Sequence, residues 1–115
     1  MTTHYSRDRN GHTAKTLHDL GNQRELLIST SKMHSGELVT RAYVHRVEGR
    51  SQIHVIGYGI DGDFSRKIMS SRPARTTVKV VQAQHEKSLE QLALILEAVQ
   101  AHYAAQAAQQ ATAHA

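Results

Sequence analysis

The feature that most constrains this chain is a largely apolar stripe in its C-terminal third. Between residues 78 and 103 the side chains of the stripe recur at alternating steps of three and four, which places them on one side of an α-helix. The stripe comprises Val78, Val81, His85, Leu89, Leu92, Leu96, Val99 and Tyr103, and Ile95 and Ala98 broaden it. Because such a helix is stable only when its apolar side is buried, we predict one long C-terminal helix that covers an apolar surface.

The start of this helix has two possible interpretations. Residues 76–81 also alternate between polar and apolar, so they could form an additional strand, with the helix then capped at Ser88. Beyond Tyr103 only Ala, Gln, Thr and His remain. We therefore predict that residues 106–115 are a low-complexity tail, which extends the helix without anchoring it.

Short β-rich runs occupy residues 24–69 and are separated by three turn signals, Ser35-Gly36, Gly49-Arg50 and Asp61-Gly62. Asp-Gly suits a type I′ turn and Gly-X a type II′ turn. This spacing predicts strands near 24–34, 37–48, 51–60 and 63–69. Together with the helix they give an α+β fold, a four-stranded antiparallel β-meander followed by one long C-terminal α-helix, in a single domain over residues 23–105.

The first 22 residues have a different composition. They carry three histidines and three Lys or Arg residues, and have almost no apolar content before Leu17 and Leu20. The basic and titratable members are His4, Arg7, Arg9, His12, Lys15 and His18. Residues 1–22 are therefore predicted to be a flexible basic N-terminal arm, with a short helix near 14–20 as the alternative.

The predicted turns also fix the register, which sorts the side chains of the meander onto two faces. The face predicted to receive the helix collects Leu27, Ser29, Met33, Leu38, Ala42, Val44, Ile53, Val55, Gly57, Phe64 and Ile68, with Arg46 and Arg66 at its rim. The other face collects Thr30, Lys32, Arg41, Tyr43, His45, Gln52, His54, Ile56, Tyr58, Lys67 and Met69.

The amino-acid composition limits the compartment and the kinds of partner that this protein can be expected to have. The chain has no cysteine, which excludes disulfides and thiolate chemistry and fits a reducing compartment, so we expect a cytoplasmic protein. Nothing in it approaches the roughly 18 apolar residues of a membrane span, so no membrane association is expected. Its formal charge of +4 at pH 7 favours a polyanionic partner but also suits many ordinary proteins.

Catalytic patterns are missing from the sequence. There is no Gly-Lys-Ser phosphate loop and no nucleophile elbow, and the aspartates at 61 and 63 flank a turn that they would stabilise. In the predicted register His45 and His54 face each other and could share a metal ion, but no third ligand is predicted beside them. We therefore expect a protein that is not an enzyme and has no metal and no cofactor.

The face that carries both basic and aromatic side chains favours nucleic-acid binding, because Tyr43 and Tyr58 could stack on bases while neighbouring cations neutralise phosphates. The order of a four-stranded meander and one helix is similar to that of the single-stranded-DNA-binding coactivators, which implies a comparable fold but assigns no residue roles. We therefore expect a nucleic-acid-binding homodimer that favours single-stranded DNA or RNA. The predicted binding residues are Lys32, Arg41, Tyr43, His45, His54, Tyr58, Lys67, Arg72 and Arg75.

A second hypothesis uses the same face differently. Tyr43, Ile56, Tyr58 and Met69 could instead bury against a protein partner, which would make the chain a small modulator or inhibitor. Salt separates the two hypotheses, because phosphate contacts weaken steeply with ionic strength whereas an apolar contact does not.

Overall fold

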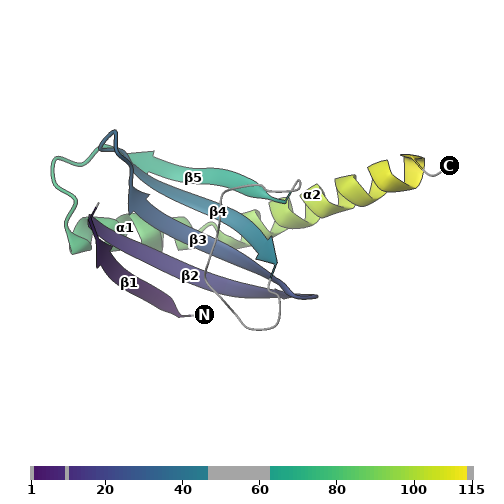
Figure 1. The fold of residues 1–115 in the computed structure, drawn as a ribbon, viewed down its shortest axis with the longest axis horizontal. Coiled ribbons are helices and arrows are strands. Elements are labelled where there is room, and N and C mark those ends of the chain that lie inside the picture. The colour runs from purple at the N-terminus through teal and green to yellow at the C-terminus, as the bar shows by residue number, and fades with distance from the viewer. Residues whose placement is uncertain (1, 10, 47–62, 114–115) are drawn as a thin grey trace.

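A computed structural model describes residues 2–9, 11–46 and 63–113. In this part of the chain a single antiparallel sheet lies against two helices, so the predicted α+β class is confirmed (Figure 1). The strands neighbour one another in chain order, and the elements are β1 (Thr3–Asp8), β2 (Gly11–Gly21), β3 (Arg24–Lys32), β4 (Leu38–Arg46), β5 (Ser65–Ser71), α1 (Val78–Leu89) and α2 (Leu92–Ala113). The described residues thus form five strands and two helices, where four strands and one helix were predicted.

The predicted flexible N-terminal arm is wrong, because residues 3–8 and 11–21 form β1 and β2. Gly21 pairs with Arg24, so β2 and β3 are joined by a two-residue turn. Both turn residues, Asn22 and Gln23, have positive φ values of 52° and 62°, as a type I′ turn requires. Asp19 supports the turn, since its Oδ1 accepts a hydrogen bond of 2.8 Å from the Gly21 N–H.

The predicted strands at 24–34, 37–48 and 63–69 correspond to β3, β4 and β5. Strand β5 pairs directly with β4, in the place that the predicted meander gave to residues 51–60. That segment lies outside the described residues.

The register between β3 and β4 differs by one residue from the prediction. Lys32 pairs with Leu38, so residues 33–37 form a five-residue connection in place of a two-residue turn at Ser35-Gly36. The Met33 N–H donates to the Glu37 carbonyl at 2.8 Å, and Gly36 takes a φ of 89°. A one-residue slip turns every side chain of a strand to the other face. The residues of β3 that face the helices are consequently Leu26, Ile28 and Thr30, and the prediction of Leu27 and Ser29 is wrong.

A second irregularity lies between β4 and β5. Arg41 pairs with Lys67 and the preceding residue, Thr40, pairs with Met69, so Ile68 is an extra residue in β5. Such a bulge changes the face that the following residues occupy. Lys67 therefore lies on the sheet face opposite the helices, whereas Met69 lies on the helix side, where its Sδ is 3.9 Å from the Ser88 Oγ.

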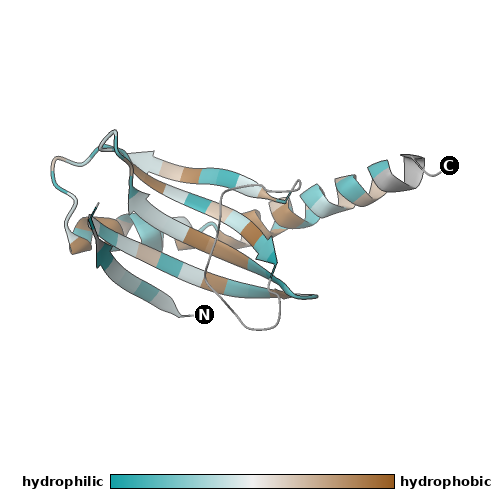
Figure 2. Ribbon diagram, viewed as in Figure 1, coloured by the Kyte–Doolittle hydropathy of each residue, from teal (hydrophilic) through white to brown (hydrophobic). Residues whose placement is uncertain are grey.

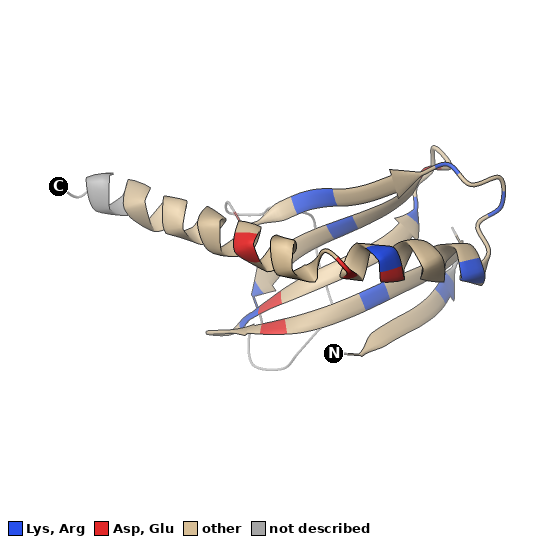
Figure 3. Cartoon of the chain, turned by 180° about the vertical axis from the view of Figure 1, so that it is seen from behind, with Lys and Arg blue, Asp and Glu red and all other residues tan. Residues whose placement is uncertain are grey.

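The C-terminal stripe forms two helices that both cross the same face of the sheet (Figures 1 and 3). Helix α1 begins at Val78, where the Thr77 hydroxyl caps it by accepting from the Val80 N–H at 3.3 Å. Residues 78–81 are therefore helical, and Ser88 lies inside α1 instead of capping a later helix. Residues 90 and 91 interrupt the helix, and α2 then runs along the sheet and projects past its edge.

Two apolar clusters form the core between the sheet and the helices. The larger cluster lies under α2 and the smaller under α1, and Figure 2 shows hydrophobic residues on the strands and on both helices. The buried members are Leu26, Ile28, Ala42, Val44, Phe64, Ile95 and Val99 in the larger cluster, and Ala14, Leu38 and Val81 in the smaller. Neither described helix is long and apolar enough to cross a membrane.

A buried hydrogen-bonded network lies in the same layer as the two clusters. The His85 Nδ1 contacts the Thr30 hydroxyl at 2.8 Å, and that hydroxyl contacts Thr40 at 2.7 Å. From the same helix, Gln84 donates to the Leu38 carbonyl at 3.0 Å and accepts from Ser71 of β5. Because each polar group has a partner, these residues can be buried at little cost, and α1 is fixed to three neighbouring strands.

Candidate functional site

The sheet face opposite the helices, called here the second face, carries a row of cationic side chains. The strand registers place His4 beside Lys15, Lys15 beside Ser29, Ser29 beside Arg41 and Arg41 beside Lys67. These five positions cross the sheet from β1 to β5, one on each strand. We call His4, Lys15, Arg41 and Lys67 the cationic row, with Ser29 at its centre.

The side chains of the row differ in exposure and in their partners. His4 and Lys67 are exposed, whereas Lys15 and Arg41 are partly buried. Lys67 forms an ion pair with Glu37, with 3.7 Å between Nζ and Oε1. The row thus presents positive charge from Lys15, Arg41 and Lys67, with His4 at the β1 edge, and a carboxylate offsets part of that charge at β5.

A band of hydroxyl groups flanks the cationic row. Next to the row the second face presents Ser6, Thr13, Ser31, Val39 and Ser70 on β1 to β5 respectively, two residues from the row on β1 to β4 and three on β5 because of the bulge at Ile68. Three of these side chains, Ser6, Ser31 and Ser70, present a hydroxyl that can donate a hydrogen bond to a phosphate oxygen, whereas Thr13 and Val39 are buried. Neighbouring bands of cations and hydroxyls therefore have the donor chemistry that contacts with a sugar–phosphate backbone require.

On its other side the row borders an apolar band formed by Leu17, Leu27 and Tyr43. Tyr43 is only 5% exposed, so its ring is not available for a base to stack on it. Farther along, His45 lies beside Glu25, with 3.8 Å between Nε2 and Oε1. The second face thus changes from cationic to apolar to a histidine–carboxylate pair along the strands.

The structure brings together some of the predicted binding residues and separates others. Arg41, Tyr43, His45 and Lys67 share the second face. Lys32 lies on the helix side, because it pairs with the core residue Leu38.

Two further predicted residues lie in the connection between β5 and α1. The Arg72 Nη1 donates to the Ser35 carbonyl at 3.2 Å, and Arg75 is exposed. His54 and Tyr58 lie outside the described residues.

The apolar residues predicted to bind a protein partner are also divided between the two sides of the sheet. Tyr43 lies on the second face and Met69 on the helix side, so these two residues do not form one apolar patch. Ile56 and Tyr58, its other members, lie outside the described residues.

Sequence reasoning missed His4 and Lys15 as members of the site because the segment that holds them was assigned to an arm. The signal that could have found them is Asn22, which tolerates the positive φ of a tight turn and lies, directly after Gly21, between two runs that contain β-branched residues. In the structure this hairpin, together with the register shift between Asp19 and Gly21, places Lys15 opposite Ser29, and Ser29 pairs in turn with Arg41.

Within the described ranges, no group of three or more His, Asp or Glu side chains is placed to hold a metal ion. The chain matches no protein-family model, no curated protein and no solved structure with which it was compared.

Proposed function

We propose that this chain is a non-enzymatic nucleic-acid-binding protein that favours single-stranded DNA or RNA and uses the second face of its sheet. The observation that carries the proposal is the cationic row, which supplies one positive or titratable side chain from each of four strands. Neighbouring strands lie about 4.8 Å apart, so the row spans roughly 19 Å across the five strands. A row of this length is long enough to contact several phosphates of one strand.

The geometry favours phosphate contacts over recognition of bases. Because Tyr43, in the apolar band beside the row, is buried, a base cannot stack on its ring, and cations with hydroxyls supply the contacts. Contacts of this kind position a strand without reading its sequence. We therefore expect affinity for many sequences, with little preference among them.

A flexible single strand suits this surface better than a duplex does. A duplex is a stiff rod that would contact the sheet along a narrow line, whereas a single strand can follow the row from His4 to Lys67. Counterion release then makes affinity dependent on salt. With about three phosphates contacted, single-strand affinity should fall roughly 20-fold between about 50 and 200 mM salt.

Fluorescence anisotropy tests this proposal. The full chain is titrated against labelled single-stranded DNA, the matching duplex and RNA of the same sequence, each at low and at moderate salt. We expect both single strands to bind more tightly than the duplex, with affinities that weaken steeply as salt rises. Absence of binding to all three at low salt would rule the proposal out. Binding that does not change with salt would instead favour an apolar contact surface.

A further inference from the structure

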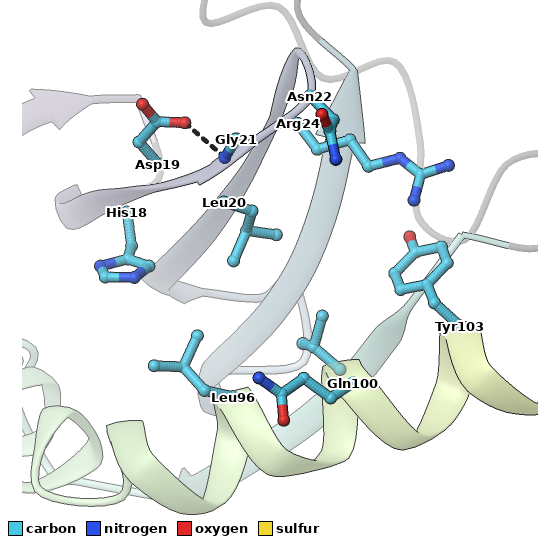
Figure 4. Close-up of a pocket in the computed structure, with 10 residues that line it drawn as sticks. His18, Asp19, Leu20, Gly21, Asn22, Arg24, Leu96, Gln100 and Tyr103 are labelled. Atoms are coloured by element: carbon cyan, nitrogen blue, oxygen red, sulfur yellow. Dashed lines mark hydrogen bonds between the residues drawn. The ribbon is translucent and has the colours of Figure 1, made fainter.

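A cavity lies between the β2–β3 turn and α2, on the opposite side of the sheet from the cationic row. Its volume is about 530 Å³, within the range of roughly 300–1,000 Å³ that is usual for small-molecule sites. Figure 4 shows the turn residues above it and Leu96 and Gln100 reaching towards it from α2. The cavity is therefore bounded by a hairpin end and a helix, two elements that are far apart in the chain.

The lining combines an apolar floor with polar walls. Leu20, Leu96 and Val99 supply the apolar surface, and Val99 is 5% exposed and belongs to the core. Arg24 and Gln100 supply donors at the wall. This combination suits a ligand with an apolar body and one polar end.

Arg24 indicates that the polar end of the ligand is negatively charged. Its guanidinium carbon lies 4.5 Å from the centre of the Tyr103 ring, and stacking on the ring holds the guanidinium plane at the side of the cavity (Figure 4). Among the described residues no carboxylate forms an ion pair with it. A partly buried guanidinium of this kind retains its N–H groups for an oxygen anion, which it binds in a planar, two-pronged geometry.

The other ionisable groups around the cavity do not cancel this charge. Asp19 also lines the cavity, but its Oδ1 accepts from the Gly21 N–H and its carboxylate points away from Leu96 and Gln100 (Figure 4). Asp63 accepts a hydrogen bond from the Tyr103 hydroxyl at 2.9 Å and pairs with Arg46 at 3.7 Å. His18, which also lines the cavity, supplies no negative charge.

From this arrangement we propose that the cavity binds a small carboxylic acid with an apolar body, such as a short fatty acid. The carboxylate binds the Arg24 guanidinium and the Gln100 amide, and the hydrocarbon part lies on Leu20, Leu96 and Val99. This site uses no residue of the cationic row. A negative result for nucleic-acid binding would therefore not count against this cavity, and a negative result for the cavity would not count against nucleic-acid binding.

The test compares three probes of equal length, octanoate, octanamide and octylamine, in titrations followed by ¹H–¹⁵N NMR of the full chain. Octanoate should shift the amide signals of residues 18–24 and 96–103. Octanamide should bind about tenfold more weakly, because it loses the charged hydrogen bonds, and octylamine should bind more weakly still. The inference fails if octanoate binds no better than octanamide or if its shifts map elsewhere.

Arg24→Gln tests the assigned residue, and Arg66→Gln is the matched control. Both arginines lie over an aromatic ring, since the Arg66 guanidinium carbon is 5.5 Å from the centre of the Phe64 ring, but only Arg24 lines the cavity. Arg24→Gln should remove the preference for octanoate over octanamide, and Arg66→Gln should leave it intact. An unchanged preference in a folded Arg24→Gln variant would overturn the assignment.

Gln100→Glu is a second variant, which serves if Arg24→Gln does not fold. Position 100 is exposed on α2, so the substitution should be tolerated. A negative charge at the wall should weaken octanoate about tenfold and strengthen octylamine. If the order of the three probes stays as in the parent chain, the cavity does not bind carboxylates.

Discussion

Thr16 and His85 lie 69 positions apart in the chain, and their side chains meet in the core, with 2.7 Å between the threonine Oγ1 and the imidazole Nε2. The same imidazole contacts Thr30 through its other nitrogen, and the Thr16 hydroxyl contacts Thr3 at 2.7 Å. One histidine therefore connects α1 to β2 and β3, and hydroxyl contacts extend the connection to β1. Both ring nitrogens are used, and threonine hydroxyls can complement a neutral imidazole by donating to one nitrogen and accepting from the other.

This arrangement predicts that the protein loses stability in mild acid. Burial lowers the pKa of His85 because desolvation disfavours the imidazolium, although Glu86 acts in the opposite direction. A group whose pKa is lowered on folding contributes full stability above its unfolded pKa, here about 6.5, and loses it as pH falls below that value. His85→Gln should reduce the fall in unfolding free energy between about pH 7 and pH 5.5.

Denaturant unfolding at several pH values measures this effect. His34→Gln is the control, because His34 is exposed in the connection between β3 and β4. If His85→Gln and the parent lose stability in parallel as pH falls, protonation of His85 is not the cause.

The hydroxyl contacts of His85 can be tested separately. Thr30→Val keeps the shape of the side chain but leaves the His85 Nδ1 without its partner, which should cost about 1–3 kcal/mol of unfolding free energy. Thr13→Val is the matched control, since Thr13 is also buried in the sheet but lies on the second face. Thermal or denaturant unfolding of both variants should show a clear loss for position 30 and a smaller one for position 13. Equal losses would mean that the contact with His85 adds nothing to the cost of replacing a buried threonine.

Neighbouring residues on α2 give a prediction for the core. Ile95 is 3% exposed and belongs to the larger apolar cluster, whereas Leu94 is 65% exposed. Ile95→Ala should destabilise the fold by about 2–5 kcal/mol through lost burial and a residual cavity. Leu94→Ala should change the unfolding free energy by less than about 0.5 kcal/mol. A similar loss for both would show that α2 does not pack as described.

The sequence predicted the strands and helical stripe where periodicity is strong and failed where hydrogen bonds replace apolar burial. Strands β3, β4 and β5 were found because hydrophobic runs and turn residues mark them. Strand β2 was missed because its buried positions include Thr13 and Thr16, and the polar partner of Thr16 lies 69 residues away on α1. No pattern within the sequence of β2 predicts a contact with a residue so distant in the chain.

The site was predicted in part for the same reason. Arg41 and Lys67 were placed on one face because both strands were recognised, whereas His4 and Lys15 depended on a hairpin that was not. Lys32 was assigned to the wrong face because the predicted pairing of β3 with β4 differs by one residue from the observed pairing. A shift of one residue turns every side chain of a strand to the other face. The predicted homodimer and cytoplasmic location stay predictions, and sedimentation equilibrium of the purified chain checks the first.

Removing one cation of the row should change how nucleic-acid binding responds to salt. Lys15→Ala deletes a positive charge from β2, so the slope of log affinity against log salt should fall by roughly 0.7 to 1, as expected for one lost phosphate contact. Lys79→Ala is the control, because Lys79 is exposed on α1, on the other side of the sheet. Anisotropy titrations at several salt concentrations measure both slopes. If the two variants change the slope equally, the effect is one of net charge and the row has no special role.

Glu37 provides the opposite test, because its carboxylate lies 3.7 Å from the Lys67 Nζ and offsets the charge at one end of the row. Glu37→Gln keeps the size of the side chain and releases Lys67 for a phosphate, so single-strand affinity should rise severalfold and the salt slope should steepen by up to about one. Glu97→Gln makes the same change of charge at an exposed position on α2 and should have a smaller effect. The same titrations compare the two variants, with circular dichroism to verify folding. A folded Glu37→Gln variant that binds no more tightly than Glu97→Gln would exclude Lys67 from the binding surface.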